Sequence, residues 1–449
     1  MDSQALERDT IAAVATPSGR GGVSIVRVSG PLALSIANSV TQRTLTVRTP
    51  TLSHFYEDGD RVIDEGIVLV FAAPKSFTGE DVVEFHGHGG LVITDMVLQR
   101  CLELGARMAR PGEFSERAFL NNKLDLTQVE ALADLIDAKT QQAARQASAS
   151  LRGAFSDAVH AINRGVIELR VYVEAAIDFP EEEVDFLDDE RVGHMLATLQ
   201  NDIDALTASA KQGAILNHGA SIALVGLPNA GKSSLLNRLA QDNVAIVTDV
   251  PGTTRDVIRQ QIALQGIPIQ LSDTAGLRET TDQIEQEGIK RALSEMRIAD
   301  LILEIVDDTS GARATWPALP GVPVITVLNK VDVSGTPEGV VGDPASNVVA
   351  VSATTGAGIE TLEQHILALL GVTESDPSSS FSARARHLTA LGQAKDLLLA
   401  ADARFKASQA GELLAEDLRE IHSVLSAITG EFGVEALLGE IFSSFCIGK

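Results

Sequence analysis

Residues 221–240 read SIALVGLPNAGKSSLLNRLA. An apolar run leads into Gly226-Leu-Pro-Asn-Ala-Gly231-Lys232-Ser233, which fits the pattern G-x-x-x-x-G-K-S between a predicted strand and a predicted helix. The glycines let backbone N–H groups wrap phosphates, Lys232 brings a positive charge to the β and γ phosphates, and Ser233 offers a hydroxyl to Mg²⁺. The segment therefore predicts a site for a nucleoside triphosphate.

Two later segments supply the phosphate-side loops that such a site needs. Thr253 and Thr254, in PGTTRD, suit a loop that closes on Mg²⁺ and the γ-phosphate. Asp273, in the DTAG that follows the apolar run IPIQLS, can hold Mg²⁺ through water, and the N–H of Gly276 can meet the γ-phosphate. These loops are expected to switch with the nucleotide state.

Two further segments predict which base is bound. Asn329-Lys330-Val331-Asp332 follows the apolar run VPVITVL, and its carboxylate can accept hydrogen bonds from N1–H and N2–H₂ of guanine. Adenine lacks that donor pair, so the pattern favours GTP over ATP. A backbone N–H from Ser352-Ala353 can support the base. The predicted GTP contacts are Asn229, Ala230, Gly231, Lys232, Ser233, Ser234, Thr248, Asp249, Val250, Pro251, Gly252, Thr253, Thr254, Asp273, Thr274, Ala275, Gly276, Asn329, Lys330, Val331, Asp332, Ser352 and Ala353.

The residue that activates water is not fixed by these motifs. Ras-like GTPases place a water-orienting glutamine directly after the DTAG-type segment, but this chain has Leu277 there. Glu285 in the acidic run that follows is the first choice, with Glu279, Asp282 and Glu287 as alternatives.

No arginine can be assigned as a finger, because Arg255 and Arg278 are equally compatible with a surface role. The amide oxygen of Asn229 could instead hold K⁺ between the phosphates and the switch loop, offsetting charge as an arginine finger does.

The chain divides into four segments by composition. Residues 1–121 read as mixed α/β, with strands expected at 21–30, 62–72 and 80–90 and a helix at 91–106. Residues 122–218 are helical, with one long helix expected over 125–151 and a second over 154–177. Residues 219–373 alternate apolar runs with helical patterns, which is typical of a doubly wound parallel sheet.

The stretch VTESDPSSS at 372–380 reads as a linker, and residues 382–449 return to helix. A helix is expected over 412–430, where apolar residues at 414, 418, 421, 425 and 428 define one face and Gly430 is the stop signal. We therefore expect an α/β multidomain chain, in which a Ras-like G domain is inserted into an all-α domain formed by 122–218 and 374–449.

Composition excludes several classes of protein. The 449 residues carry a net charge of −25, and none of the four segments is basic, so the chain alone is expected to bind nucleic acid weakly. Its two cysteines, Cys101 and Cys446, are too far apart for a disulfide scaffold or a cysteine zinc cluster. The polar start MDSQALERDT and the lack of any run of about 20 apolar residues predict a cytoplasmic chain with no secretory signal or membrane span.

The sequence blocks together resemble the MnmE (TrmE) family of tRNA-modification GTPases over the whole chain. The matching blocks include ATPSGRGGVSIVRVSG, SFTGEDVVEFHGHGG, RPGEFSERAFLNNKLDL, YVEAAIDFPEEEVDF, GLPNAGKSSLLN, TDVPGTTRD, DTAGLR and the terminal FCIGK. The resemblance implies that 1–121 is a folate-binding and dimerisation domain, followed by the helical domain and its inserted G domain.

The resemblance also implies site residues. A 5-formyltetrahydrofolate-type ligand is expected to contact Arg27, Glu84, Lys123 and Lys449 near the interface of a homodimer. The positions that match the family's K⁺ ligands are Asn229, Thr248, Val250 and Thr253, and those that match its Mg²⁺ ligands are Ser233 and Thr254. Glu285 matches the water-activating glutamate. Cys446 matches a near-terminal cysteine, whose thiol could serve the modification chemistry or could be a buried apolar side chain.

The family implies a partner, the FAD-dependent MnmG (GidA) protein, in a heterotetramer-type complex. Together they would add an aminomethyl or carboxymethylaminomethyl group at C5 of the tRNA wobble uridine. The alternatives are a ribosome-assembly GTPase of the Era or Der type and a GTP-binding scaffold. The acidic helical segment after the G domain disfavours the first, and intact Lys232, Ser233, Thr254 and Asp273 disfavour the second.

Overall fold

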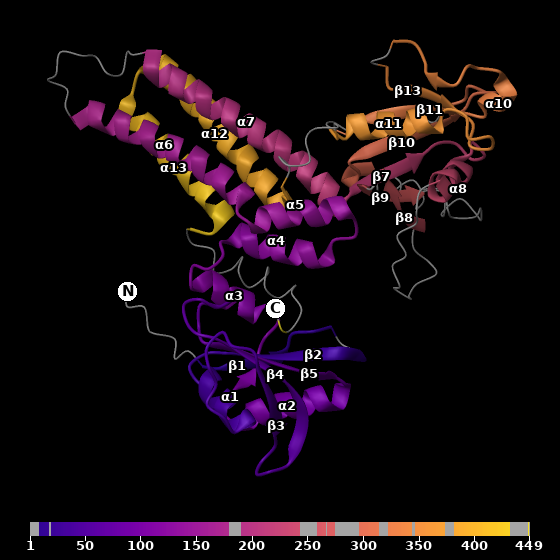
Figure 1. Cartoon of the computed structure of the whole chain (residues 1–449). Helices are drawn as coiled ribbons and strands as arrows, with labels where there is room; N and C mark the ends of the chain where they lie inside the picture. The colour runs from indigo at the N-terminus through magenta and orange to yellow at the C-terminus, as the bar shows by residue number, and fades with distance from the viewer. Residues whose placement is uncertain are drawn as a thin grey trace, which may run out of the picture. The chain divides into compact units, whose positions relative to one another are not determined.

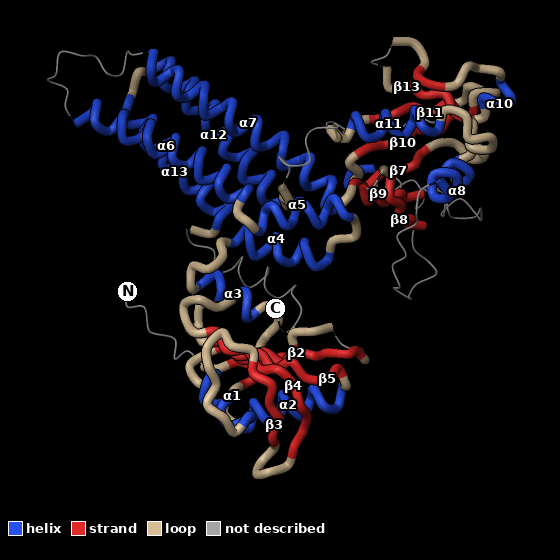
Figure 2. Tube along the Cα trace, viewed as in Figure 1, coloured by secondary structure: helices blue, strands red, loops and turns tan. Residues whose placement is uncertain are grey.

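The computed structural model describes residues 9–17, 19–178, 190–242, 258–265, 267–273, 296–313, 322–343, 346–372, 381–431 and 448. The chain divides into two compact units, Met1–Ala133 with Ser426–Lys449, and Asp134–Leu425. Figure 1 labels the elements of both units, and Figure 2 shows that the sheets and the long helices occupy separate parts of the chain. No helix in the described ranges is long and apolar enough to cross a membrane.

The first unit is built on a six-stranded sheet of order β3-β4-β5-β2-β1-β6, antiparallel except for the pair β1–β6. Its strands are β1 (Ile11–Val14), β2 (Gly21–Ser29), β3 (Thr51–Tyr56), β4 (Val62–Phe71), β5 (Val82–Gly89) and β6 (Arg107–Met108), and its helices are α1 (Ala33–Thr41), α2 (Leu91–Glu103) and α3 (Glu113–Leu120). The expected strands at 21–30, 62–72 and 80–90 and the helix at 91–106 are confirmed. β1, β3 and β6 were not anticipated.

The two faces of this sheet differ, because alternate residues of a strand point to opposite sides. One face carries Val26, Val83, Phe85 and Val68, which are buried in a core with α1 and α2. On the other face, Arg27 of β2 lies directly opposite Glu84 of β5. The second face is the one that presents polar side chains.

A charged network fastens α3 to the strands. Arg117 donates to Glu80 at 3.0 Å, to Glu113 at 3.2 Å and to Asp9 at 2.7 Å, and Arg107 bridges Asp9 and Glu113. Glu113 is only 2% exposed. Burial raises its pKa, but the hydrogen bonds from Arg107, the Arg110 N–H and Arg117 outweigh burial and lower the pKa to about 2.

The second unit contains a helical bundle assembled from two distant stretches of chain. Its helices are α5 (Gln141–Leu151), α6 (Ala154–Asp178), α7 (Glu190–His218), α12 (Ala385–Ser408) and most of α13 (Gly411–Thr429). The Ser150 hydroxyl accepts from the Ser382 N–H at 2.8 Å, and Arg384 donates to Asp134 at 2.6 Å. These bonds join residues more than 200 positions apart, as the inserted arrangement requires.

One expected helix is wrong. The segment 125–151 forms two helices, α4 (Leu126–Asp137) and α5, instead of one. The Thr140 side chain accepts a hydrogen bond from the Ala143 N–H at 3.1 Å and so caps the start of α5. The helices expected over 154–177 and 412–430 are confirmed, and the predicted apolar face of the latter is buried.

The rest of the second unit is a seven-stranded sheet of order β12-β13-β11-β10-β7-β9-β8. Its elements are β7 (Ala220–Val225), β8 (Ile258–Leu264), β9 (Ile267–Asp273), β10 (Leu301–Asp307), β11 (Val324–Asn329), β12 (Gly339–Val340), β13 (Val348–Val351), α8 (Lys232–Asp242), α10 (Val331–Ser334) and α11 (Ile359–Leu369). The five central strands are parallel, while β8 and β12 add antiparallel edges. The doubly wound sheet is confirmed, and β8 and β12 are additions to it.

Helix α7 runs almost directly into this sheet, since only Gly219 separates it from β7. Leu216, in the last turn of α7, is buried in the core of the sheet domain. Gly219 has φ +83°, and a Cβ there would lie 2.2 Å from the Pro268 carbonyl oxygen of β9. A glycine is therefore required at this joint.

Candidate nucleotide site and N-terminal ion-pair site

The phosphate loop connects β7 to α8. Gly226 has φ +151°, and a Cβ there would lie 2.3 Å from the Ile305 carbonyl oxygen, so only glycine allows this close approach to β10. Lys232 begins α8 and is 5% exposed. Its ammonium group donates to the carbonyl oxygens of Gly226 and Leu227 at 2.8 and 2.9 Å. The charge predicted to meet phosphate is thus held inside the loop.

The loop also contains two residues in left-handed backbone conformation. Asn229 has φ +64° and is exposed. Gly231 has φ +98°, and a Cβ there would lie 2.1 Å from Nδ2 of Asn329. The second glycine of the motif therefore leaves room for the base-side loop. Ser233 and Ser234 follow in the exposed first turn of α8.

Asn329 joins the phosphate loop to the base-side loops. This side chain is 1% exposed, donates from Nδ2 to the Ala230 carbonyl at 2.9 Å, and accepts at Oδ1 from the Ala353 N–H at 3.1 Å. An amide is suited to this position because it offers a donor and an acceptor in one plane. The structure thus brings together three segments predicted separately from sequence.

The carboxylate predicted to read guanine is oriented by a hydroxyl. Ser352 Oγ donates to Oδ1 of Asp332 at 2.6 Å and accepts from the Thr355 N–H at 3.1 Å. Val331 between the two polar motif residues is buried. The carboxylate is therefore held at the edge of the loop formed by Ser352 and its neighbours.

Asp307 is a part of this site that the motifs did not indicate. It lies at the end of β10 and accepts from the Lys330 ammonium at 2.6 Å. The Lys330 hydrogen bond, followed by that of the Thr309 hydroxyl, lowers the pKa of Asp307 to about 2. Its only signal in the sequence is a carboxylate at the carboxyl end of an apolar run, where ligands of parallel sheets gather.

Several predicted residues lie outside the described residues: Thr248, Asp249, Val250, Pro251, Gly252, Thr253, Thr254, Thr274, Ala275, Gly276, Glu285, Cys446 and Lys449. Asp273 is described at its backbone only, where it pairs with Leu224 of β7. That register puts it at the same end of the sheet as the phosphate loop.

The first unit holds a second group of predicted residues. Arg27 donates from Nε to Oε1 of Glu84 at 2.9 Å, and His86 Nε2 lies 3.2 Å from Oε2. The guanidinium of Arg27 lies over the rings of Phe77 at 5.4 Å and Phe114 at 5.7 Å. Both oxygens of Glu84 are thus oriented by neighbouring side chains.

Of the other two predicted folate contacts, Lys123 is described and Lys449 lies outside the described residues, next to Gly448. Lys123 is exposed, and its side chain packs beside Gly79, where an added Cβ would lie 2.9 Å from Asn121 Cβ and 3.2 Å from Lys123 Cγ. Gly448 packs on the end of β1, where its Cβ would lie 2.1 Å from the Val14 carbonyl oxygen. The penultimate residue of the chain therefore reaches the strand next to Arg27.

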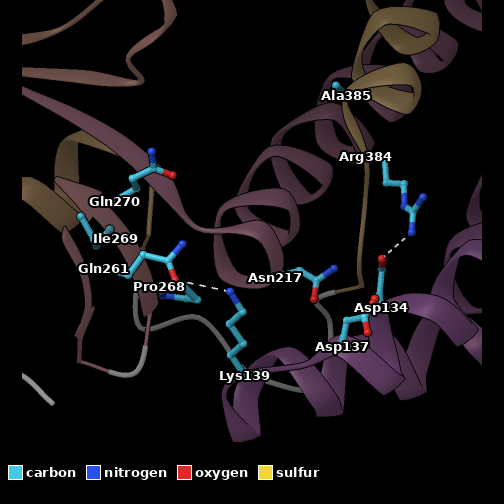
Figure 3. A pocket seen from close by; sticks show the side chains of 10 residues that line it. All are labelled: Asp134, Asp137, Lys139, Asn217, Gln261, Pro268, Ile269, Gln270, Arg384 and Ala385. Atoms are coloured by element: carbon cyan, nitrogen blue, oxygen red, sulfur yellow. Dashed lines mark hydrogen bonds and ion pairs between the residues drawn. The ribbon is translucent and has the colours of Figure 1, made fainter. Parts of the chain in front are cut away.

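A polar cavity of about 530 Å³ lies in the second unit and is distinct from the nucleotide loops. Figure 3 shows Lys139 reaching Gln261 of β8 and Arg384 reaching Asp134; the bonds measure 3.4 and 2.6 Å. The cavity is lined by the first residues of β9, whereas the nucleotide loops follow the carboxyl ends of the strands. The cavity therefore lies between the bundle and the end of the sheet opposite the nucleotide loops.

The chain matches two family models. The MnmE helical domain matches residues 126–446, and the GTP-binding protein TrmE N-terminus matches residues 10–123. A crystal structure of Aquifex aeolicus Era bound to GDP.AlF4- matches 40% of this chain and 67% of that chain, at 27% identity. The TM-score of this match is 0.27.

Curated relatives match nearly the whole chain. The tRNA modification GTPase MnmE of Pseudomonas fluorescens (strain Pf0-1) is 51% identical over 453 residues, covering 98% of this chain and 99% of the relative. The protein of the same name from Pseudomonas aeruginosa (strain UCBPP-PA14) is 52% identical over 452 residues with the same coverage. At this identity and coverage, the chain belongs to the MnmE family of tRNA-modification GTPases.

Proposed function

We propose that this chain is a K⁺-dependent GTPase that acts, with an FAD-dependent partner of the MnmG type, at C5 of the tRNA wobble uridine. The observation that carries the GTP part is the side chain of Asn329, which joins the phosphate loop to the base-side loop beside Asp332. The tRNA part rests on family membership. The group added would be aminomethyl or carboxymethylaminomethyl.

In the GTPase step, each residue has a defined task. Asp332 pairs with guanine N1–H and N2–H₂, and the buried Lys232 ammonium offsets phosphate charge. The Ser233 hydroxyl, in the exposed first turn of α8, fits Mg²⁺ together with Thr254. Glu285 would accept a proton from the attacking water. Mg²⁺, when bound, neutralises charge on the β and γ phosphates.

K⁺ dependence is the sharpest part of this proposal. The left-handed backbone of Asn229 and its exposure favour an amide oxygen available to a monovalent cation, with Thr248, Val250 and Thr253 as further ligands. We expect hydrolysis to need K⁺ and to be slow in Na⁺ at equal ionic strength. Equal rates in the two salts would refute this part and leave the GTPase assignment intact.

A folate site would use Arg27, Glu84, Lys123 and Lys449. The Glu84 carboxylate, aligned by Arg27 and His86, suits the paired donors of a pterin ring, and the cations suit a glutamate tail. These residues would bind and orient the ligand, which when bound would supply a one-carbon unit. Equilibrium dialysis measures the binding of 5-formyltetrahydrofolate without turnover. If the site is correct, Glu84→Gln should bind this folate more weakly than wild type.

Cys446 is proposed to act as a thiol at the folate-derived carbon. Cys446→Ser should keep GTP hydrolysis and lose modification if the thiol takes part in the chemistry. If Cys446 is only a buried apolar side chain, Cys446→Ser should affect stability more than modification.

A contact between the G domain and the helical bundle supports a proposal for how nucleotide state could be transmitted. The β8–β9 hairpin lies in the sequence between the two loops expected to switch, PGTTRD at 251–256 and DTAG at 273–276, and Gln261 of the hairpin accepts from Lys139 at 3.4 Å. We propose that ordering of the switch segments, and pairing of G domains in a homodimer, moves this hairpin against the bundle. The acidic chain would drive the switch while the partner's basic surface holds the tRNA.

The test of the whole proposal is mass spectrometry of wobble-uridine nucleosides from cells that lack the gene, with and without the gene restored. Loss and recovery of C5-aminomethyl-type nucleosides is the expected result. Unchanged nucleosides would overturn the tRNA part and favour a role in ribosome assembly.

A further inference from the structure

Helix α8 starts at the phosphate loop, and Arg238 in the middle of the helix contacts the loop that follows β13. Arg238, six residues after Lys232, donates from Nε to the Ala353 carbonyl at 3.2 Å and from Nη2 to the Thr354 carbonyl at 2.5 Å. A Cβ on Gly356 would lie 3.6 Å from the Arg238 Cζ, so the guanidinium also covers that glycine. One side chain thus binds two consecutive carbonyls of the base-side loop.

These contacts close a ring of interactions around the nucleotide loops. The Ala230 carbonyl accepts from Asn329, and Asn329 accepts from the Ala353 N–H. The carbonyl of the same residue, Ala353, accepts from Arg238. Arg238 belongs to α8, which begins two residues after Ala230. The phosphate loop and the base-side loop are therefore joined twice, once through Asn329 and once through Arg238.

We propose that Arg238 is a positioning residue that fixes the base-side loop, Ser352–Gly356, to the phosphate-loop helix and thereby slows nucleotide release. A guanidinium suits this role because its planar fork binds two acceptors at once and stays charged at every relevant pH. Lysine would keep the charge and lose the fork. The described hydrogen bonds of the Arg238 guanidinium go to backbone carbonyls of this loop, so its effect should fall on binding and not on the chemical step.

The test is stopped-flow release of methylanthraniloyl-labelled GDP from the full chain, chased with excess GDP. Arg238→Met removes both hydrogen bonds and should raise the dissociation rate constant about 10-fold, the ratio that corresponds to about 1.4 kcal/mol. Arg238→Lys should fall between Arg238→Met and wild type. Arg313→Met, at an exposed arginine of the same domain, is the matched control and should release labelled GDP like wild type.

Single-turnover hydrolysis at saturating GTP distinguishes a specific effect of Arg238→Met on nucleotide release from a general loss of the site's structure. The rate should be unchanged in Arg238→Met, while KM for GTP rises in step with the dissociation rate. Release within twofold of wild type, or loss of the single-turnover rate together with faster release, would overturn the proposal. The inference rests on guanine binding beside Asp332: failure of the wild type to bind labelled GDP would refute that site itself, whereas unchanged release would refute only the role of Arg238.

Discussion

At the scale of single residues, the nucleotide site shows how amide and carboxylate side chains organise backbone loops. Asn329 satisfies one carbonyl and one N–H from two different loops, and Asp307 holds Lys330 by a short ion pair. A single amide can do this because its donor and acceptor are fixed in one plane. The loops around the nucleotide are therefore ordered by side chains of neighbouring strands.

The best residue for a pH experiment is Glu113, whose pKa is lowered to about 2. A carboxyl with a lowered folded pKa stabilises the fold fully above its unfolded value near 4.5, and loses that contribution as pH falls through about 2. Glu113→Gln should lower the free energy of unfolding at pH 7 by up to about 3 kcal/mol. The difference in the free energy of unfolding between Glu113→Gln and wild type should shrink as pH falls from about 4.5 toward 2.

Urea denaturation of the full chain at several pH values measures this gap. Glu116→Gln is the control, because Glu116 is on the same helix but pairs only with the exposed Arg110 at 2.9 Å among the described contacts. It should change stability by less than about 1 kcal/mol. A Glu113→Gln gap that does not depend on pH would show that the loss comes from packing and not from the charge.

At the scale of elements, the joint between α7 and β7 is the most constrained point of the second unit. Gly219→Ala places a Cβ against the Pro268 carbonyl at 2.2 Å and puts a non-glycine residue at φ +83°. The expected loss of stability is at least about 2 kcal/mol, since left-handed backbone alone costs about 1–2 kcal/mol for a residue with a Cβ.

Gly193, near the start of the same helix, is the matched control. A Cβ there meets nothing within 4 Å, so Gly193→Ala should stabilise the chain by about 0.5–1 kcal/mol. Thermal unfolding of the two variants should therefore shift the midpoint in opposite directions. Two shifts of the same sign would contradict the role given to the joint.

Elements with a clear local period were predictable, and those fixed by distant contacts were not. The apolar residues of 412–430 recur at helical spacing, and this local pattern predicted α13 and its buried face. The break between α4 and α5 depends on the Thr140 cap, which the continuous apolar pattern masked. The bond from Arg107 to Asp9 joins residues 98 positions apart, and no local pattern shows such a pairing.

The nucleotide site divides in the same way. The motif residues Lys232, Asn329 and Asp332 were predictable, because phosphate and guanine demand particular groups at fixed places along the chain. Asp307 and Arg238 lie outside the motifs. Asp307 pairs with the Lys330 ammonium, and Arg238 donates to the Ala353 carbonyl. Their roles become visible only when the strands and α8 are assembled.

At the scale of the whole molecule, the charge of −25 makes association of two copies unfavourable unless an apolar surface offsets repulsion. The sheet face that carries Arg27 and Glu84 also carries a pair of exposed apolar side chains. Leu52 and Ile67 lie directly opposite each other on β3 and β4, 62% and 42% exposed, and Ile67 is next to His86 on β5. We propose this exposed pair as part of the interface of the predicted homodimer.

Ile67→Arg tests that dimer, because a symmetric interface receives every substitution twice. Losing the burial of one isoleucine, about 1.5–3 kcal/mol, and adding a charge on each side should weaken the dimer by well over tenfold. Light scattering across a dilution series should then show monomers at concentrations where the wild type is dimeric. Val171→Arg, at a similarly exposed position of α6, should leave the dimer intact. If both variants stay dimeric, the interface does not include Leu52 and Ile67.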